Sequence, residues 1–278
     1  MPRIALGLEY DGSRYRGWQI QAHALSVQAA LEKALSSVAD HPVAVVSAGR
    51  TDAGVHAAMQ VVHFDADVER SARAWVLGAN TLLDVDISAL WAQMVPNGFH
   101  ARYSALARTY RYLILNRMSR PALDRERACW IRQPLNEQLM HLAAQALVGE
   151  HDFSSLRAAE CQSSTPMRRL ERIAVARCDE YVSVVVTANA FLHHMVRNIV
   201  GVLLAIGSGE QPVDWCRQVL QARDRRLGGI TAPPQGLTLI GVRYPNEFAL
   251  ASEADPEIFQ DRHLPGAIRS RIDRAGSS

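Results

Sequence analysis

The sequence predicts an α+β protein made of two domains that share the element order βαββαβ. Short segments with alternating apolar residues indicate strands that bury one face, and longer segments with apolar residues at helical spacing indicate helices between them. The order of elements in residues 3–95 is repeated from residue 109 to residue 244. No sequence identity between the halves is evident, so the predicted repeat is one of architecture.

The first half starts with a strand in which alternate apolar residues share one face: Ile4, Leu6, Leu8 and Tyr10. Ser26 can cap the helix that follows, which runs to Ala39. β-Branched residues at 43–46 and an apolar run at 59–64 indicate two further strands. A helix at 71–82 and a strand at 87–95 complete the first βαββαβ unit.

The second half contains the same series with one additional short helix. We expect strands at 109–115, 169–178, 181–189 and 237–244, and helices at 136–148 and 192–206. This division predicts a first domain at 1–104 and a second at 105–250. The polar composition of 251–278 predicts a flexible tail.

Composition indicates a globular protein without a membrane span. The chain has 278 residues, 48% of them hydrophobic, and its 30 Lys and Arg against 28 Asp and Glu give a formal charge of +2. A charge this small means that any nucleic-acid site must come from local clustering of basic residues. The longest apolar run, 199–206, is far shorter than the ~20 residues that cross a bilayer.

The four cysteines show neither a C-x-x-C pair nor metal-ligand spacing. The N-terminal residues enter a strand and carry no signal-peptide pattern. We therefore expect a cytoplasmic protein with free thiols and no membrane role.

The stretch Gly49-Arg50-Thr51-Asp52-Ala53-Gly54-Val55-His56-Ala57 joins two predicted strands and combines an acid, a base and two glycines. Gly49 and Gly54 permit a positive φ or a close approach by another backbone. Such a loop can hold the Asp52 carboxylate rigidly against a ligand. Asp and Gly are also common in ordinary turns, so these residue types alone leave both interpretations open.

The nine residues taken together resemble the active-site loop of the tRNA pseudouridine synthase A family. Further segments resemble that family in the expected order: Tyr10-Asp11-Gly12-Ser13, Gly17-Trp18-Gln19, Phe99-His100-Ala101-Arg102, Arg108-Thr109-Tyr110-Arg111-Tyr112, Asp152-Phe153-Ser154-Ser155, Cys161-Gln162-Ser163 and Asn189-Ala190-Phe191-Leu192-His193-His194-Met195-Val196-Arg197-Asn198. The resemblance spans residues 3–244, so it does not depend on one short motif.

This resemblance implies an isomerase that converts uridine to pseudouridine in the anticodon stem-loop of tRNAs, at tRNA positions 38–40. It implies a homodimer that binds tRNA and uses no metal and no other cofactor. It also implies ferredoxin-like or RRM-like domains with their sheets side by side and an active-site cleft between them. Asp52 matches the catalytic residue of the family.

Arg197 and Tyr110 are the other catalytic candidates. A buried guanidinium in an apolar helix needs an anionic partner, although the spacing of His193, Arg197 and Gly201 also fits a solvent-facing stripe. The resemblance favours pairing of Arg197 with Asp52. Tyr110 matches the family's active-site tyrosine, which stacks on the target base and is a candidate for proton transfer at uracil C5. The pattern of its strand also fits a tyrosine in the core.

Arg50, His56 and Arg168 are candidates for substrate binding. Arg50 can bind phosphate or fill the space left by a base turned out of its stack. Arg168 forms a basic pair with Arg169 next to a polar loop. Each also has an alternative role: Arg50 as an ordinary surface arginine, His56 as a structural histidine, and Arg168 as part of a solvated connector.

A metal site and two other functions are the alternatives. His193 and His194 suggest zinc, but neighbouring residues on a helix point about 100° apart and no third ligand has a suitable spacing, so we predict no metal. A non-catalytic RNA-binding protein lacks the expected aromatic signature. A phosphatase with Asp52 as nucleophile lacks an acidic cluster for Mg²⁺.

Overall fold

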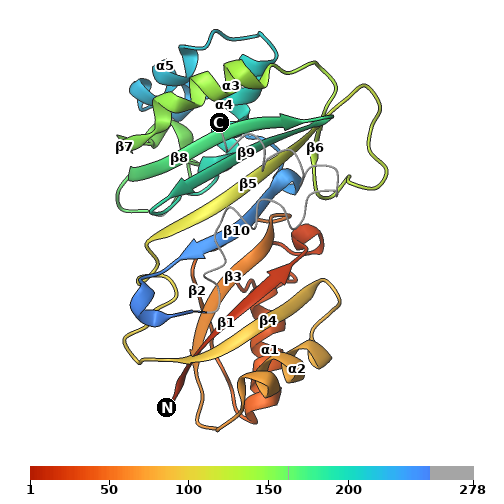
Figure 1. Cartoon of the computed structure of the whole chain (residues 1–278), viewed down its shortest axis with the longest axis vertical. Helices are drawn as coiled ribbons and strands as arrows, with labels where there is room; N and C mark the ends of the chain where they lie inside the picture. The colour runs from red at the N-terminus through yellow and green to blue at the C-terminus, as the bar shows by residue number, and fades with distance from the viewer. Residues whose placement is uncertain (162, 251–278) are drawn as a thin grey trace, which may run out of the picture.

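The computed structural model describes residues 1–161 and 163–250, and in these ranges ten strands form one mixed sheet whose strands follow one another along the longest axis of the molecule (Figure 1). The strands are β1 (Arg3–Tyr10), β2 (Val46–Ser47), β3 (His56–Asp65), β4 (Ile87–Val95), β5 (Ala107–Asn116), β6 (Cys129–Ile131), β7 (Gly149–Asp152), β8 (Met167–Cys178), β9 (Tyr181–Ala188) and β10 (Leu237–Arg243). The helices of four or more residues are α1 (Val27–Ala39), α2 (Ala72–Leu82), α3 (Glu137–Ala144), α4 (Met195–Gly207) and α5 (Trp215–Ala222). Gln162 and the predicted tail 251–278 lie outside the described residues.

Both halves of the chain have the same strand order within this sheet. The order along the sheet is β4-β1-β3-β10-β5-β9-β8-β7, with β2 on β3 and β6 on β5. The order in the first half is therefore β4-β1-β3-β2. In the second half, leaving aside the short strands β6 and β7, it is β10-β5-β9-β8. In both halves the last strand in sequence lies beside the first. The halves join where β10 runs parallel to β3, with Thr238 opposite His56 and Leu239 opposite Ala57. This junction lies immediately after the loop that carries Asp52.

The structure confirms the α+β class and most of the predicted elements. Ser26 and Ser71 cap α1 and α2, each accepting from the N–H three residues ahead. The strand expected at 43–46 is wrong, because only Val46–Ser47 pairs with β3. β6 and β7 were not predicted, since they are short and gain their pairing from β5 and β8. None of the helices in the described ranges combines the length and apolar character that a membrane span needs.

The Phe99–Arg102 link between the halves packs against β3 through His63. The Ala101 N–H donates to His63 Nδ1 over 3.1 Å, and the rings of His63 and Phe99 meet edge to face with centroids 6.1 Å apart. Burial, with smaller contributions from the charges of Arg3 and His100, lowers the pKa of His63 to about 4. The folded protein therefore keeps this imidazole neutral.

We expect the protein to lose stability as the pH falls from about 6.5 toward 4, because the unfolded chain takes up a proton at His63 that the folded chain excludes. His63→Asn should flatten this pH dependence by roughly 1–2 kcal/mol, since an amide oxygen can accept the same bond without titrating. Thermal unfolding at about pH 7 and about pH 4.5 measures the difference, with His23→Asn, an exposed histidine, as the control. Equal losses of Tm in all three proteins would contradict this role.

Candidate active site

The loop between β2 and β3 is held by contacts on the residues that precede its aspartate. Gln60 of β3 donates from Nε2 to the Gly49 carbonyl over 2.7 Å, and the Trp18 N–H donates to the Thr51 carbonyl over 3.0 Å. The hydroxyls of Tyr10 and Thr51 lie 2.8 Å apart in the core. Any movement of the loop therefore requires several of these bonds to break together.

Glycines allow the backbone to bend and approach closely around this loop. Gly54 has φ +75°, the left-handed conformation that its sequence position predicts. Gly17 has φ +97°, and a Cβ there would stand 2.7 Å from the Thr51 carbonyl oxygen. Gly49 does not adopt a positive φ; its lack of a side chain instead leaves space near the Tyr110 hydroxyl, which is 3.8 Å from the position of an added Cβ.

The Asp52 carboxylate lies against three basic side chains, two just before α4 and one in its first turn. Its Oδ1 is 3.4 Å from His193 Nε2, and its Oδ2 is 3.5 Å from both His194 Nε2 and Arg197 Nη1. The Asp52 side chain is 24% exposed, so a bound molecule can reach it. The structure thus brings together Asp52 and Arg197, as the resemblance implies, and adds two histidines.

Both histidines precede α4, which corrects the prediction of a helix from residue 192. His194 has φ +61°, and this left-handed residue turns the chain just before Met195. The two rings consequently lie together, with centroids 4.0 Å apart. Burial lowers the pKa of His194, while the Asp52 charge acts in the opposite direction.

The sequence argument against a metal site is also corrected. It assumed a helical separation of the two histidines and the absence of a third ligand. Asp52 supplies a third donor: the ligand atoms of Asp52, His193 and His194 all lie within 4.8 Å of one another.

Arg197 is held in place by the segment that leads to β10. Its Nε donates to the Ala232 carbonyl over 2.7 Å, and the Ala232 N–H donates back to the Arg197 carbonyl over 3.1 Å. Gly201 lets this segment rest on α4, because a Cβ there would stand 1.7 Å from the Ile230 carbonyl oxygen. Arg197 is therefore fixed through Nε while Nη1 faces Asp52.

Tyr110 projects from β5 toward the same loop. Its ring meets Phe191 edge to face, with centroids 5.0 Å apart. The residue is only 7% exposed, and burial, together with the nearby Tyr10 and Asp52, raises the pKa of its hydroxyl well above the usual range. Tyr110 thus presents a protonated hydroxyl close to Gly49.

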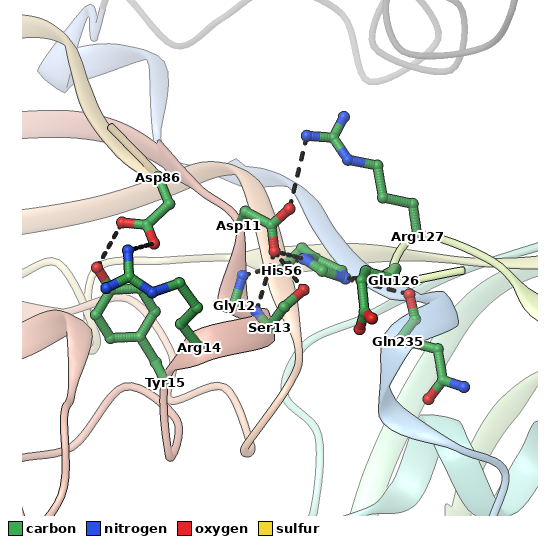
Figure 2. A network of polar contacts seen from close by, with 10 residues as sticks. All are labelled: Asp11, Gly12, Ser13, Arg14, Tyr15, His56, Asp86, Glu126, Arg127 and Gln235. Atoms are coloured by element: carbon green, nitrogen blue, oxygen red, sulfur yellow. Dashed lines mark hydrogen bonds and ion pairs between the residues drawn. The ribbon is translucent and has the colours of Figure 1, made fainter. Parts of the chain in front are cut away.

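His56 closes the far end of the loop through contacts with three other segments (Figure 2). The Gly12 N–H donates to Nδ1 over 3.0 Å, and Nε2 faces the carbonyls of Glu126 at 2.7 Å and Gln235 at 3.1 Å. Because carbonyl oxygens only accept, Nε2 carries the hydrogen. Asp11 Oδ1 lies 3.2 Å from Nδ1 and accepts from the Ser13 N–H and hydroxyl. The contact with His56 and these bonds from Ser13 hold the pKa of the Asp11 carboxyl well below its usual range. His56 therefore joins the two halves, with Nδ1 bonded to the first half and Nε2 bonded to the second.

The rest of the network in Figure 2 anchors the segment that follows β1. The Tyr15 hydroxyl donates to Asp86 Oδ1 over 2.6 Å, and Arg14 Nη1 lies 3.0 Å from Asp86 Oδ2. The Ser13 N–H donates to Asp11 Oδ1 over 3.0 Å. The Tyr10-Asp11-Gly12-Ser13 motif thus supports the loop that carries Asp52.

Of the other two candidates for substrate binding, one lies on the surface and one lies at the start of β8, bonded to the loop that precedes this strand. Arg50 is exposed, two residues before the aspartate in sequence. Arg168 donates from Nη1 to the carbonyls of Thr165 and Met167, and from Nη2 to Ser163 Oγ. A role of either arginine in substrate binding stays a prediction.

Arg108 was not singled out from the sequence, although its guanidinium bonds to backbone carbonyls of several segments around the site. It is 8% exposed, and its guanidinium donates to the carbonyls of Ala48, Arg102, Ala105 and Asn189. The available signal was an arginine at the start of a strand that is otherwise mainly apolar and aromatic.

Comparison with known proteins identifies the family. The model of the family described as tRNA pseudouridine synthase matches residues 8–104 and 143–245, which include Asp52 and Arg197, while Tyr110 falls between the two ranges. The chain is 57% identical over 250 residues to the tRNA pseudouridine synthase A of Coxiella burnetii (strain Dugway 5J108-111), covering 90% of this chain and 96% of that protein.

Two further relatives have the same description. That of Nitrosococcus oceani is 56% identical over 254 residues, covering 91% of this chain and 98% of the relative. That of Legionella pneumophila (strain Corby) is 53% identical over 257 residues, covering 92% of this chain and 98% of the relative. The chain therefore belongs to the tRNA pseudouridine synthase family and is an isomerase.

Proposed function

We propose that this tRNA pseudouridine synthase acts on uridines of the anticodon stem-loop, at tRNA positions 38–40. The pairing of Asp52 with Arg197 carries the proposal, because it supplies an oriented and partly exposed carboxylate. The target base must leave its stack to reach this group, and unstacking costs least at the end of a stem or in a loop.

The reaction exchanges one bond to ribose C1′ for another without a net change of oxidation state. The bond between uracil N1 and C1′ breaks, the base turns, C5 bonds to C1′, and the C5 proton moves to N1 through a protein group or solvent. Asp52 acts in the first step as nucleophile or base, and the ion pair with Arg197 keeps it oriented. Tyr110 stacks on the base and takes part in proton transfer at C5. Neither a metal nor another cofactor enters this scheme.

The substrate-binding residues follow from the same arrangement. Arg50 binds a phosphate or fills the space left by the turned-out base, since it is exposed in the same loop as Asp52. Arg168 binds phosphate after exchanging one of its contacts within the loop. His56 supports substrate binding through the segments that it joins.

We further propose two pseudo-symmetric, ferredoxin-like or RRM-like domains, at 1–104 and 105–250, whose sheets meet edge to edge with the active-site cleft between them. The common strand order of the two halves supports this division. Asp52 comes from the first domain and Arg197 from the second, so neither domain has a complete site. The protein acts in the cytoplasm as a homodimer, in which one subunit positions tRNA for the other.

Tritium release from tRNA transcripts labelled at uridine C5 tests the proposed specificity. A transcript with uridines at 38–40 should release tritium, with EDTA present, in proportion to the number of those uridines. A matched transcript with cytidine at all three positions should release none. Release from the cytidine transcript would place the target elsewhere, and binding without release from either transcript would favour the non-catalytic RNA-binding alternative.

Arg197→Lys should lower kcat roughly 10- to 100-fold with a small change in KM. A lysine keeps the charge, but it cannot hold the Ala232 carbonyl and face Asp52 at the same time as a guanidinium does. Initial rates of tritium release over a range of tRNA concentrations separate kcat from KM. Arg217→Lys, at an exposed position of α5, is the control. An unchanged kcat in Arg197→Lys would show that the ion pair does not orient Asp52.

A further inference from the structure

Asp52, His193 and His194 present three metal-binding atoms to one point at the edge of the active site. In a tetrahedral zinc site with bonds of about 2.0–2.1 Å, neighbouring ligand atoms stand about 3.4 Å apart. His193 Nε2 lies 3.4 Å from Asp52 Oδ1, and His194 Nε2 lies 3.5 Å from the other carboxylate oxygen, Oδ2. The three ligand atoms lie within 4.8 Å of one another, so small rotations of the side chains would complete the geometry.

The chemistry of the donors selects among metal ions. Two imidazoles and one carboxylate suit Zn²⁺, whereas Mg²⁺ and Ca²⁺ favour sites built from oxygen alone. The side chains of His193, His194 and Asp52 are 37%, 28% and 24% exposed, so an ion can enter and water can complete its coordination. Structural zinc sites have four protein ligands. A site with three protein ligands and one open position is better suited to an ion that binds and leaves.

Arg197 determines how such an ion is bound. Its Nη1 lies 3.5 Å from Asp52 Oδ2, so a metal bound through Oδ1 would leave the other oxygen paired with the guanidinium. Contacts of this kind orient a metal-bound carboxylate. The Arg197 charge also repels the ion, so binding here is weaker than at a site without a neighbouring cation.

We propose that Zn²⁺ binds reversibly to Asp52, His193 and His194 and inhibits the enzyme by occupying the Asp52 carboxylate. The inhibition rests on the catalytic role proposed for Asp52, whereas the binding does not. Bound zinc would withdraw the carboxylate from the ribose or the base. It would also place a positive ion where the target nucleotide must enter.

Isothermal titration of the metal-free full-length protein with ZnCl₂ tests the binding. We expect one site per chain that weakens at least ~10-fold in His193→Gln and in His194→Gln, because each change removes a ligand. His23→Gln removes an exposed imidazole outside the group and should bind as wild type does. Equal affinity in all four proteins would overturn the proposal, as would the absence of binding in the wild type.

Tritium release with and without ZnCl₂ tests the inhibition. The ratio of the two rates should be small for the wild type and His23→Gln, should return to one after addition of EDTA, and should be closer to one for the two site variants. Using a ratio removes any effect of these substitutions on turnover itself. Zinc binding by a wild-type protein that releases no tritium would refute the proposed catalysis but leave the site intact. Zinc inhibition equal in all proteins would overturn the site.

Discussion

Asp52→Asn is expected to lower the rate of tritium release at least ~1000-fold while tRNA binding and folding stay close to wild type. Asparagine keeps the shape of the side chain but lacks the negative charge that a nucleophile or base requires. The loop should keep its position, because Gln60 and Tyr10 hold its backbone and Thr51 independently of the carboxylate. Loss of the ion pair with Arg197 should cost only about 1 kcal/mol, since the pair is partly exposed.

Single-turnover rates, tRNA binding and thermal unfolding should be measured on the same preparations of Asp52→Asn. Asp67→Asn, at an exposed acidic position, removes the same charge outside the site and should retain the wild-type rate. A rate for Asp52→Asn within tenfold of the wild type would exclude a central chemical role for this carboxylate. A parallel loss of tRNA binding would instead indicate that the residue serves recognition.

The elements that were predicted correctly are those whose signals are local. The alternation in β1 and the caps Ser26 and Ser71 lie within the segments that they define. The elements that were missed depend on distant partners, as β6 does on β5 and β7 on β8. The place of β10 between β3 and β5 likewise depends on pairing across the whole length of the chain. No periodicity within a strand contains that information.

The candidate site shows the same division. The sequence motifs identified Asp52 and Arg197, and the structure places them 3.5 Å apart. The positions of His193 and His194 were predicted wrongly, because the positive φ of His194 makes the helix begin at Met195, later than hydrophobic periodicity indicates. A helical pattern tolerates polar residues at its ends, so it does not locate such a turn.

Arg108 connects the parts of this site that are distant in sequence. Its Nε and Nη2 donate to the Ala48 carbonyl at 3.2 and 2.9 Å, directly before the loop of Asp52, and its Nη1 donates to the Asn189 carbonyl at 2.8 Å, ahead of the two histidines. Two further acceptors, the carbonyls of Arg102 and Ala105, belong to the link between the halves. Burial lowers the pKa of Arg108, because the charged guanidinium loses its contact with water. The hydrogen bonds to these carbonyls offset that loss.

Arg108→Lys should therefore lower both the stability and kcat. An ammonium has three donors at one point and cannot reach carbonyls on opposite sides of a guanidinium, so some of them lose their partner, at about 1–3 kcal/mol each. Urea unfolding measures the stability, and kcat measured well below the unfolding midpoint isolates the positioning of Asp52, with an expected loss of about tenfold or more. Arg243→Lys, on the neighbouring strand β10 with an exposed partner in Glu171, is the matched control. A destabilised Arg108→Lys protein with wild-type kcat would show that Arg108 supports the fold without aligning the two halves of the site.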